Sequence, residues 1–155
     1  ENLNQLKIFK QQQISLVHSV TTNHTLTEAQ SGAVLFWEHG GAHEITLPSA
    51  TAGMYFKFIL KVGSAHAQNL VSQSSDKIYG KVFVSTNNAS DKCSVQQLGK
   101  GSAVDKVKLH STTLTLGGNI GDVIELYCYE DGYWNCDARL TTSGGNPGTI
   151  VVLAN

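Results

Sequence analysis

The stretch Met54-Tyr55-Phe56-Lys57-Phe58-Ile59-Leu60-Lys61-Val62 decides the fold, because apolar residues occupy every second position in it. The even-numbered residues are all apolar and fall on one face of an extended chain, whereas Lys57 and Lys61 fall on the other. A period of two is typical of a half-buried β-strand, since a helix would repeat every 3.6 residues or so. Pro48 and Gly53 precede the stretch as turn signals. The stretch therefore predicts a strand that begins directly after a turn.

Short apolar runs and turn residues continue to alternate as far as the C-terminus. Clear turn signals are Gly40-Gly41, Asn87-Asn88, Gly117-Gly118, Asp131-Gly132 and Gly144-Gly145. About eleven strands are expected, at residues 33–38, 44–47, 54–62, 69–72, 77–85, 94–98, 104–110, 113–116, 122–129, 133–140 and 149–153. Only residues 27–30 have the pattern of a helical turn. The predicted fold class is an all-β, antiparallel β-sandwich that resembles a jelly roll.

The first 20 residues differ from the rest of the chain, because they are rich in Gln and contain no Gly. Their apolar residues include Leu6, Ile8, Phe9, Ile14 and Leu16. A segment of this kind cannot fold alone, so these side chains must pack on the domain or on a neighbouring subunit. We expect residues 1–20 to form an N-terminal arm or edge strand with these apolar residues as attachment contacts, and residues 21–155 to form one β-sandwich domain.

Composition excludes several classes of protein. Charged residues make up 15% of the 155 residues and the net charge is -1, whereas a typical domain is about 25% charged. Lys and Arg are scattered, so we expect no nucleic-acid partner. The longest apolar run is far shorter than the roughly 20 residues that span a bilayer, so we expect no membrane partner. The low charge favours a surface that is partly covered by other subunits.

The last predicted hairpin carries two of the three cysteines, Cys128 and Cys136. A two-residue loop would oppose Cys128 to a polar residue, so we predict a three-residue loop with Gly132 in the left-handed conformation. In that register Leu126 faces Cys136 and Cys128 faces Trp134. A loop shifted by one residue would instead pair the two cysteines. Buried free thiols are favoured, and a disulfide is the alternative.

Candidate catalytic and metal-binding groups have simpler structural interpretations. His39 and His43 flank a glycine-rich turn, but two imidazoles do not make a metal site. The chain has no Gly-x-Ser-x-Gly nucleophile motif. Carboxylates gather near the last hairpin, and we expect them to be solvated acids of turns and strand edges: Asp122, Glu125, Glu130, Asp131 and Asp137. We therefore expect no catalytic residues, no bound metal and no cofactor.

Three tyrosines of the last hairpin are the candidate ligand or subunit contacts, namely Tyr127, Tyr129 and Tyr133. A ring with a polar tip suits both a subunit interface and the stacking of a sugar. We favour the interface, with sugar binding as the alternative.

Six short motifs follow one another between residues 25 and 140. They are Thr25-Leu26-Thr27-x-Ala29-x-Ser31-Gly32, Ile45-Thr46-Leu47-Pro48, Ala52-Gly53-x-x-Phe56-x-Phe58, Asp76-Lys77-Ile78-x-Gly80, Gly121-Asp122-x-Ile124-x-Leu126 and Trp134. This order resembles a β-domain that is common in particle proteins of phages and marine viruses, such as capsid decoration proteins, knobs, fibres and minor capsid proteins. That family is defined by fold and assembly, and the resemblance implies no catalytic residues.

The resemblance implies a non-enzymatic virion protein that is assembled in the host cell. We expect it to self-associate, with a trimer as the most favoured state, and to attach to a major capsid or tail protein through the N-terminal arm. The alternative function is a carbohydrate-binding module that attaches to host glycans on a cell surface.

Overall fold

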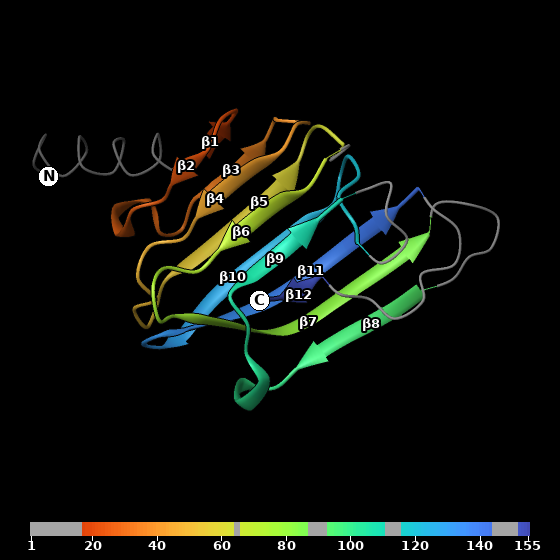
Figure 1. Cartoon of the computed structure of the whole chain (residues 1–155). Helices are drawn as coiled ribbons and strands as arrows, with labels where there is room; N and C mark the ends of the chain where they lie inside the picture. The colour runs from red at the N-terminus through yellow and green to blue at the C-terminus, as the bar shows by residue number, and fades with distance from the viewer. Residues whose placement is uncertain (1–16, 64–65, 87–92, 111–115, 144–151) are drawn as a thin grey trace, which may run out of the picture.

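Two packed β-sheets form the protein in a computed structural model that describes residues 17–63, 66–86, 93–110, 116–143 and 152–155 (Figure 1). Sheet A contains, in spatial order, β1 (Val17–Val20), β3 (Val34–Trp37), β5 (Tyr55–Leu60), β10 (Val123–Glu130), β11 (Tyr133–Thr142), β7 (Lys77–Thr86) and β8 (Cys93–Leu98). Sheet B contains β12 (Leu153–Ala154), β9 (Lys106–Leu109), β6 (Gln68–Val71), β4 (His43–Thr46) and β2 (His24–Thr25). The predicted all-β sandwich is confirmed.

Both sheets are mixed, which corrects the prediction that the strands are antiparallel. Of ten described strand pairings, five are parallel. Successive strands from β1 to β6 alternate between sheets A and B, so the chain winds around the sandwich. Each strand that returns to a sheet then runs parallel to the strand two places earlier in the chain. The crossover that parallel pairing requires is here a strand of the opposite sheet.

Most predicted strands match observed strands to within a few residues. The predicted strand at 113–116 lies outside the described residues, and so does most of the one at 149–153. The short strands β1 and β2 were not predicted as separate elements. The expected helical turn at 27–30 is confirmed as the 3-10 helix η1 (Glu28–Gln30), and a second one, η2 (Lys100–Ser102), was missed.

The stretch at residues 54–62 shows why the sandwich forms. Phe56, Phe58 and Leu60 are buried between the sheets, while the intervening residues of β5 lie on the outer face of sheet A. Phe56 packs on Trp134 with ring centroids 5.7 Å apart, and Phe58 packs on Trp37 at 6.2 Å. The apolar residues that alternate in the sequence of β5 are therefore the residues that are buried, as a half-buried strand requires.

The last hairpin confirms the predicted apolar register and changes the predicted loop. Leu126 pairs with Cys136, and Gly132 has a φ of 81°. Glu130 pairs with Tyr133, so the loop contains two residues instead of the expected three. The register shifts by one before Glu130, and this β-bulge absorbs the residue that would otherwise have lengthened the loop.

All three cysteines are free in the structure. Cys128 and Cys136 are buried, in agreement with the favoured interpretation, and the thiol of Cys128 donates to the carbonyl oxygen of Glu130 at 3.1 Å. Burial raises the pKa of Cys128 and of Cys136. Cys93 is exposed on β8. The two buried thiols therefore act as small apolar core residues.

Candidate functional site

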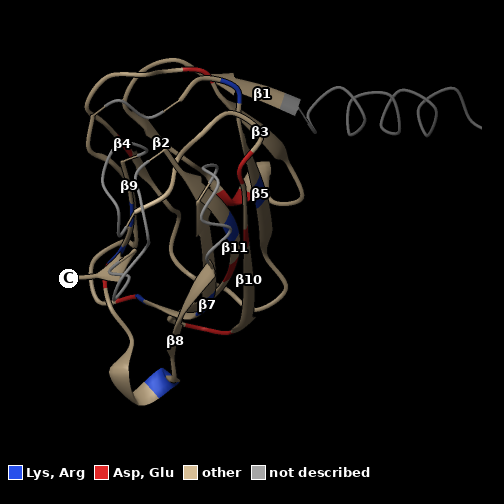
Figure 2. Cartoon of the chain, turned by 90° about the vertical axis from the view of Figure 1, so that its right-hand side faces the viewer, with Lys and Arg blue, Asp and Glu red and all other residues tan. Residues whose placement is uncertain are grey.

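The outer face of sheet A is the candidate functional surface, because its strands arrange aromatic, charged and apolar side chains in three parallel rows. The tyrosine row runs across four strands through Tyr55, Tyr127, Asn135 and Tyr79. The charged row runs through Lys57, Glu125, Asp137, Lys81 and Gln97. The apolar row runs through Phe36, Ile59, Val123, Arg139, Phe83 and Val95, with Arg139 as its one charged member. Figure 2 shows sheet A from the side, with acidic and basic positions on neighbouring strands.

Part of the charged row is already paired. Lys57 Nζ lies 3.2 Å from Glu125 Oε1, and the hydroxyl of Tyr55 donates to the same oxygen at 3.0 Å. Partial burial acts to raise the pKa of Glu125, but the hydrogen bonds from Lys57 and Tyr55 outweigh it and the pKa is lowered. Burial, and then the hydrogen bond to Glu125, raise the pKa of Tyr55. Glu125 is therefore an ionised structural partner.

The three tyrosines predicted as contacts separate into two groups. Tyr127 and Tyr129 stack with centroids 6.0 Å apart, and Tyr127 also contacts Tyr55 at 4.8 Å. Tyr133 instead meets Tyr79 edge-on at 6.3 Å, and Lys100 Nζ lies 4.3 Å from the Tyr133 centroid. The structure thus places them on one end of sheet A but not in one cluster.

On the described part of sheet A, hollows open at opposite ends of the strands. The hairpin-end hollow has a volume of about 400 Å³ and lies beside the start of β7 and β11. Its lining residues are Tyr79, Gly80, Lys81, Gln97, Leu98, Gly99, Lys100, Asn135, Cys136 and Asp137. The far-end hollow has a volume of about 520 Å³ and is lined by Phe83, Ser85, Cys93, Gly121, Asp122, Arg139, Leu140 and Thr141. A smaller hollow of about 170 Å³ lies between them, over Lys57, Val123 and Arg139.

Exposed apolar side chains gather at the far end. Ile120 is 72% exposed in the loop that leads into β10, Val95 is 52% exposed on β8 and Phe83 is 38% exposed on β7. Ile120 is followed directly by Gly121 and Asp122, which line the far-end hollow. A protruding apolar residue and a hollow therefore lie side by side on one end of the molecule.

Asp122 holds this loop in place and corrects the prediction that it is a solvated acid, since only 4% of it is exposed. Its Oδ2 accepts hydrogen bonds from the backbone N–H groups of Gly118 and Asn119 at 2.9 Å each and of Thr141 at 2.8 Å. Its Oδ1 accepts from the Thr141 hydroxyl at 2.7 Å. Burial raises the pKa of Asp122, and these hydrogen bonds oppose the rise. The carboxylate therefore fixes the loop that presents Ile120.

Of the other predicted acids, Glu125 and Asp137 are cross-strand partners that line the hollow of about 170 Å³, whereas Glu130 and Asp131 lie at the hairpin loop. Glu130 forms an ion pair with Lys100 at 2.6 Å, and Asp131 Oδ1 accepts from the backbone N–H of Ala52 at 2.9 Å. Asp137 is exposed in the charged row. Glu130 and Asp131 fit the expected turn acids, whereas Glu125 and Asp137 lie on the central strands β10 and β11, which corrects the prediction that they are edge acids.

His39 and His43 come together, with ring centroids 4.8 Å apart. His43 is buried against Trp37 at 5.5 Å. Burial lowers the pKa of His43, and His39 and His24 lower it further. Within the described residues, no group of three or more His, Cys, Asp or Glu side chains is arranged to hold a metal ion.

The predicted arm contacts Leu6, Ile8, Phe9, Ile14 and Leu16 lie outside the described residues. The last four residues of the segment 1–20 form β1, an edge strand that pairs with β3. In the described part of the chain, no helix has the length and hydrophobicity needed to cross a bilayer.

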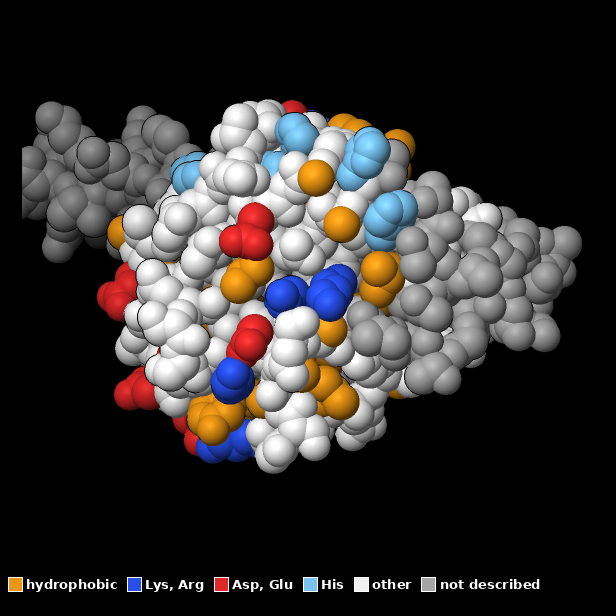
Figure 3. Space-filling model, in the orientation of Figure 1, with side chains coloured by type: hydrophobic (Ala, Val, Ile, Leu, Met, Phe, Trp, Pro, Cys, Tyr) orange, Lys and Arg blue, Asp and Glu red, His pale blue; other side chains and the backbone are white. Residues whose placement is uncertain are grey.

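The outer face of sheet B differs from that of sheet A. Figure 3 views the molecule from this side and shows mainly backbone and uncharged polar side chains, with scattered hydrophobic and acidic side chains, basic residues near the centre and histidines along the upper rim. The rows of tyrosine and apolar side chains are thus a property of sheet A.

Comparison of the chain with protein-family models, with curated proteins and with solved structures finds no significant match. Inference about function therefore depends on the residues and surfaces of this chain.

Proposed function

We propose that this protein is a non-enzymatic structural domain of a viral particle, of the capsid decoration, knob or fibre type. It self-associates, with a trimer as the expected state, and attaches to a major capsid or tail protein through residues 1–20. The viral assignment is supported by the order of motifs between residues 25 and 140. The observation that carries the self-association is the exposed Ile120 beside the far-end hollow.

The contact between subunits follows from the shape of the far end. Ile120 of one copy enters the far-end hollow of a second copy and packs against Phe83, which lines that hollow and is partly exposed. Full burial of an Ile side chain contributes about 1.5–3 kcal/mol. A protrusion that fits a different patch on its neighbour makes a heterologous contact, which closes into a ring when the rotation allows. A cyclic trimer satisfies this condition.

The edge of sheet A supports the role of the arm. Residues 1–16 precede β1 directly, so the chain enters the domain at the outermost strand of sheet A. An edge strand offers unpaired backbone groups to another chain. Attachment at this edge leaves the far end available for contacts between copies.

Light scattering coupled to size exclusion tests the proposal on the full chain and on two matched variants. Ile120→Ser removes the protruding residue, and Tyr129→Ser removes a residue that is 67% exposed at the opposite end of sheet A. We expect the native chain and Tyr129→Ser to be trimers that persist at high salt, because an apolar contact is not screened. Ile120→Ser should be a monomer. A monomeric native chain, or a trimer that tolerates Ile120→Ser, would contradict the proposal.

Attachment to the particle is tested separately by deletion of residues 1–16. The shortened chain keeps β1 and should remain folded and trimeric. When it is added to particles that lack the native protein, it should no longer bind to them. Retained particle binding would exclude the arm as the attachment segment.

A further inference from the structure

The hairpin-end hollow is separate from the proposed subunit contact. The two linings share no residue, and their nearest members on β7, Lys81 and Phe83, are two residues apart, which corresponds to about 7 Å along a strand. The proposed contact lies at and beyond the far end, where Ile120 protrudes. The hairpin-end hollow can therefore stay open in an assembled trimer.

A glycine shapes the floor of this hollow. Gly80 sits in the middle of β7 with a φ of 132°, and a Cβ added there would lie 2.1 Å from the carbonyl oxygen of Cys136 on β11. Gly in the interior of a strand marks a place where another backbone or a ligand approaches closely. Here the backbones of β7 and β11 approach each other at Gly80 and Cys136. These two residues form the bottom of the hollow, and the polar side chains next to them in sequence form its sides.

Four polar side chains around the hollow are without partners in the described part of the chain. Lys81 and Gln97 come from β7 and β8, and Asn135 and Asp137 come from β11; within the described residues none of the four makes a hydrogen bond or an ion pair. Other acids of this region are used internally: Glu125 is paired with Lys57 and Glu130 with Lys100. The hollow is thus the part of the charged row where donors and acceptors are left for a ligand.

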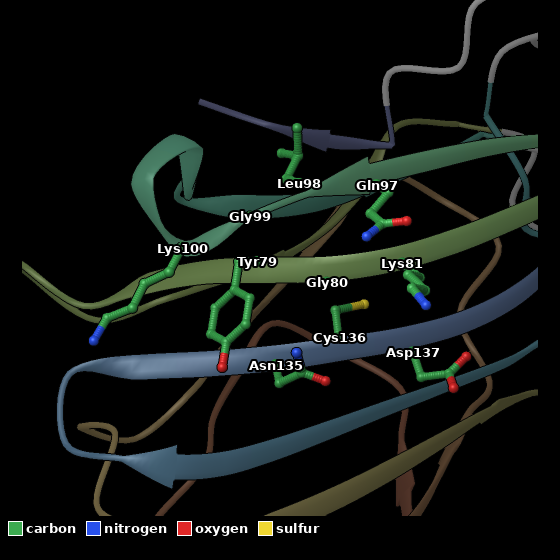
Figure 4. Close-up of a pocket in the computed structure, with 10 residues that line it drawn as sticks. All are labelled: Tyr79, Gly80, Lys81, Gln97, Leu98, Gly99, Lys100, Asn135, Cys136 and Asp137. Atoms are coloured by element: carbon green, nitrogen blue, oxygen red, sulfur yellow. The ribbon is translucent and has the colours of Figure 1, made fainter.

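An aromatic wall completes the hollow. In Figure 4 the ring of Tyr79 extends from β7 over β11 towards Asn135, on the side of the sheet where Asp137 also lies, whereas Leu98 points to the opposite side. Tyr133 braces Tyr79 through an edge-on ring contact at 6.3 Å. A half-buried ring held in this way offers a fixed apolar surface beside the polar groups.

This combination selects a class of ligand. Sugar hydroxyls both donate and accept hydrogen bonds, which amide side chains can match in both directions, while a carboxylate only accepts and an ammonium only donates. The carbon face of a sugar ring stacks on a tyrosine ring. Lys81 and Asp137 carry opposite charges, and the charge of Lys100 is already paired, so the lining does not favour an anion. The volume of the hairpin-end hollow, about 400 Å³, lies within the range of small-molecule sites, about 300–1,000 Å³.

We infer that the hairpin-end hollow binds a neutral saccharide, with Tyr79 as the stacking surface and Asn135, Asp137, Gln97 and Lys81 as the hydrogen-bonding groups. The hollow opens on the surface of sheet A, so it accepts one or two sugar units of a longer chain. This is a recognition site in addition to the proposed assembly role, and it would let a particle component also contact a glycan-coated surface.

The test is a titration of the ¹⁵N-labelled full chain with maltose, lactose and N,N′-diacetylchitobiose, followed by NMR. At least one of the three disaccharides should shift the amide signals of residues 79–81, 97–99 and 135–137 saturably, with a Kd of about 1 mM, the weak end of the usual affinity range. Asn135→Ala and Asp137→Ala should each weaken binding about tenfold, as expected for the loss of one or two good hydrogen bonds.

Matched substitutions on the outer face of sheet B are the controls. Asn69→Ala and Glu44→Ala make equivalent chemical changes on β6 and β4, and they should leave the affinity unchanged. The inference is overturned if none of the disaccharides shifts these signals at tens of millimolar, or if the shifts map to other residues. It is also overturned if the hollow variants bind normally, or if only an anionic sugar such as 3′-sialyllactose binds.

The same titration on Ile120→Ser keeps this result independent of assembly. Sugar binding that persists in an Ile120→Ser monomer supports the inference whatever the oligomeric state. Sugar binding by a native chain that proves monomeric would likewise leave the inference intact while the proposed trimer fails.

Discussion

Replacing Asp122 should both destabilise the domain and release the loop that presents Ile120. Asp122→Ala leaves three backbone N–H groups, those of Gly118, Asn119 and Thr141, without their acceptor. Each buried unpaired group costs about 1–3 kcal/mol. Removal of a buried carboxylate offsets part of this loss, because burial itself is unfavourable for the charge and raises the pKa of Asp122. We therefore take about 1 kcal/mol, the low end of the range, for each of the three N–H groups, and expect the free energy of unfolding to fall by about 3 kcal/mol.

Urea unfolding followed by tryptophan fluorescence measures this loss, because Trp37 and Trp134 are both buried in the core. With a slope of about 2 kcal/mol per molar urea, the midpoint should fall by about 1.5 M. The measurement is made in the Ile120→Ser background at one protein concentration, so that subunit dissociation does not contribute.

Asp122→Asn is the matched variant for this experiment. Its amide oxygen can replace Oδ2 as acceptor for the three N–H groups, so it should lose only about 1 kcal/mol from the weaker, uncharged hydrogen bonds. In the background that retains Ile120, Asp122→Ala should also weaken self-association more than Asp122→Asn does. A loss below about 1 kcal/mol for Asp122→Ala, or equal losses for the two variants, would refute the assignment of Asp122 as the acceptor that fixes the loop.

Three other predictions follow from single positions. Gly80→Ala should lower the free energy of unfolding by at least about 3 kcal/mol, because the added Cβ meets backbone atoms of β11 and the positive φ is strained for Ala. Gly99→Ala has open space around its Cβ and should leave the melting temperature nearly unchanged. Similar melting temperatures for the two variants would contradict the close approach of β7 and β11. Titration with a thiol reagent should modify Cys93 quickly and the two buried cysteines only in denaturant. The proposed subunit contact predicts a higher Cys93 rate in Ile120→Ser than in the native chain, and equal rates would place Cys93 outside that contact. Because burial lowers the pKa of His43, the unfolded state binds more protons than the folded state below about pH 6.5, and stability should fall as the pH decreases below that value. His43→Phe should make the urea midpoint less dependent on pH. A parallel decline of the midpoint in both proteins would assign the pH dependence to other groups.

Local pattern was sufficient to predict much of sheet A. Residues 54–62, 122–129 and 133–140 alternate strictly enough that the strand and its buried face follow from the sequence, and Phe56, Leu126 and Trp134 lie where the alternation predicts. The register of the last hairpin also follows from matching apolar faces. The loop length does not, because a bulge can absorb one residue without changing which faces meet.

The candidate site was predicted only in part. The sequence indicated that Tyr133 and Asp137 lie on the outer face, since they alternate with buried residues. It did not indicate that Tyr79, Lys81 and Gln97 join them, because β7 lies beside β11 through a parallel pairing between segments far apart in the chain. Ile120 was missed for another reason. A single Ile in a glycine-rich loop has no periodicity, and only the hydrogen bonds to Asp122 show that the loop is fixed.

By itself, the sequence determined that the chain forms short strands with one buried face each, because the period of two is written into neighbouring residues and acts locally. It also determined the low charge that suits a surface in contact with other molecules. The tertiary structure alone decided that the chain winds alternately through both sheets, which strands are neighbours, and hence which side chains share a row or surround a hollow. These features depend on how distant strands pack against one another, and local alternation of apolar residues is compatible with more than one such arrangement.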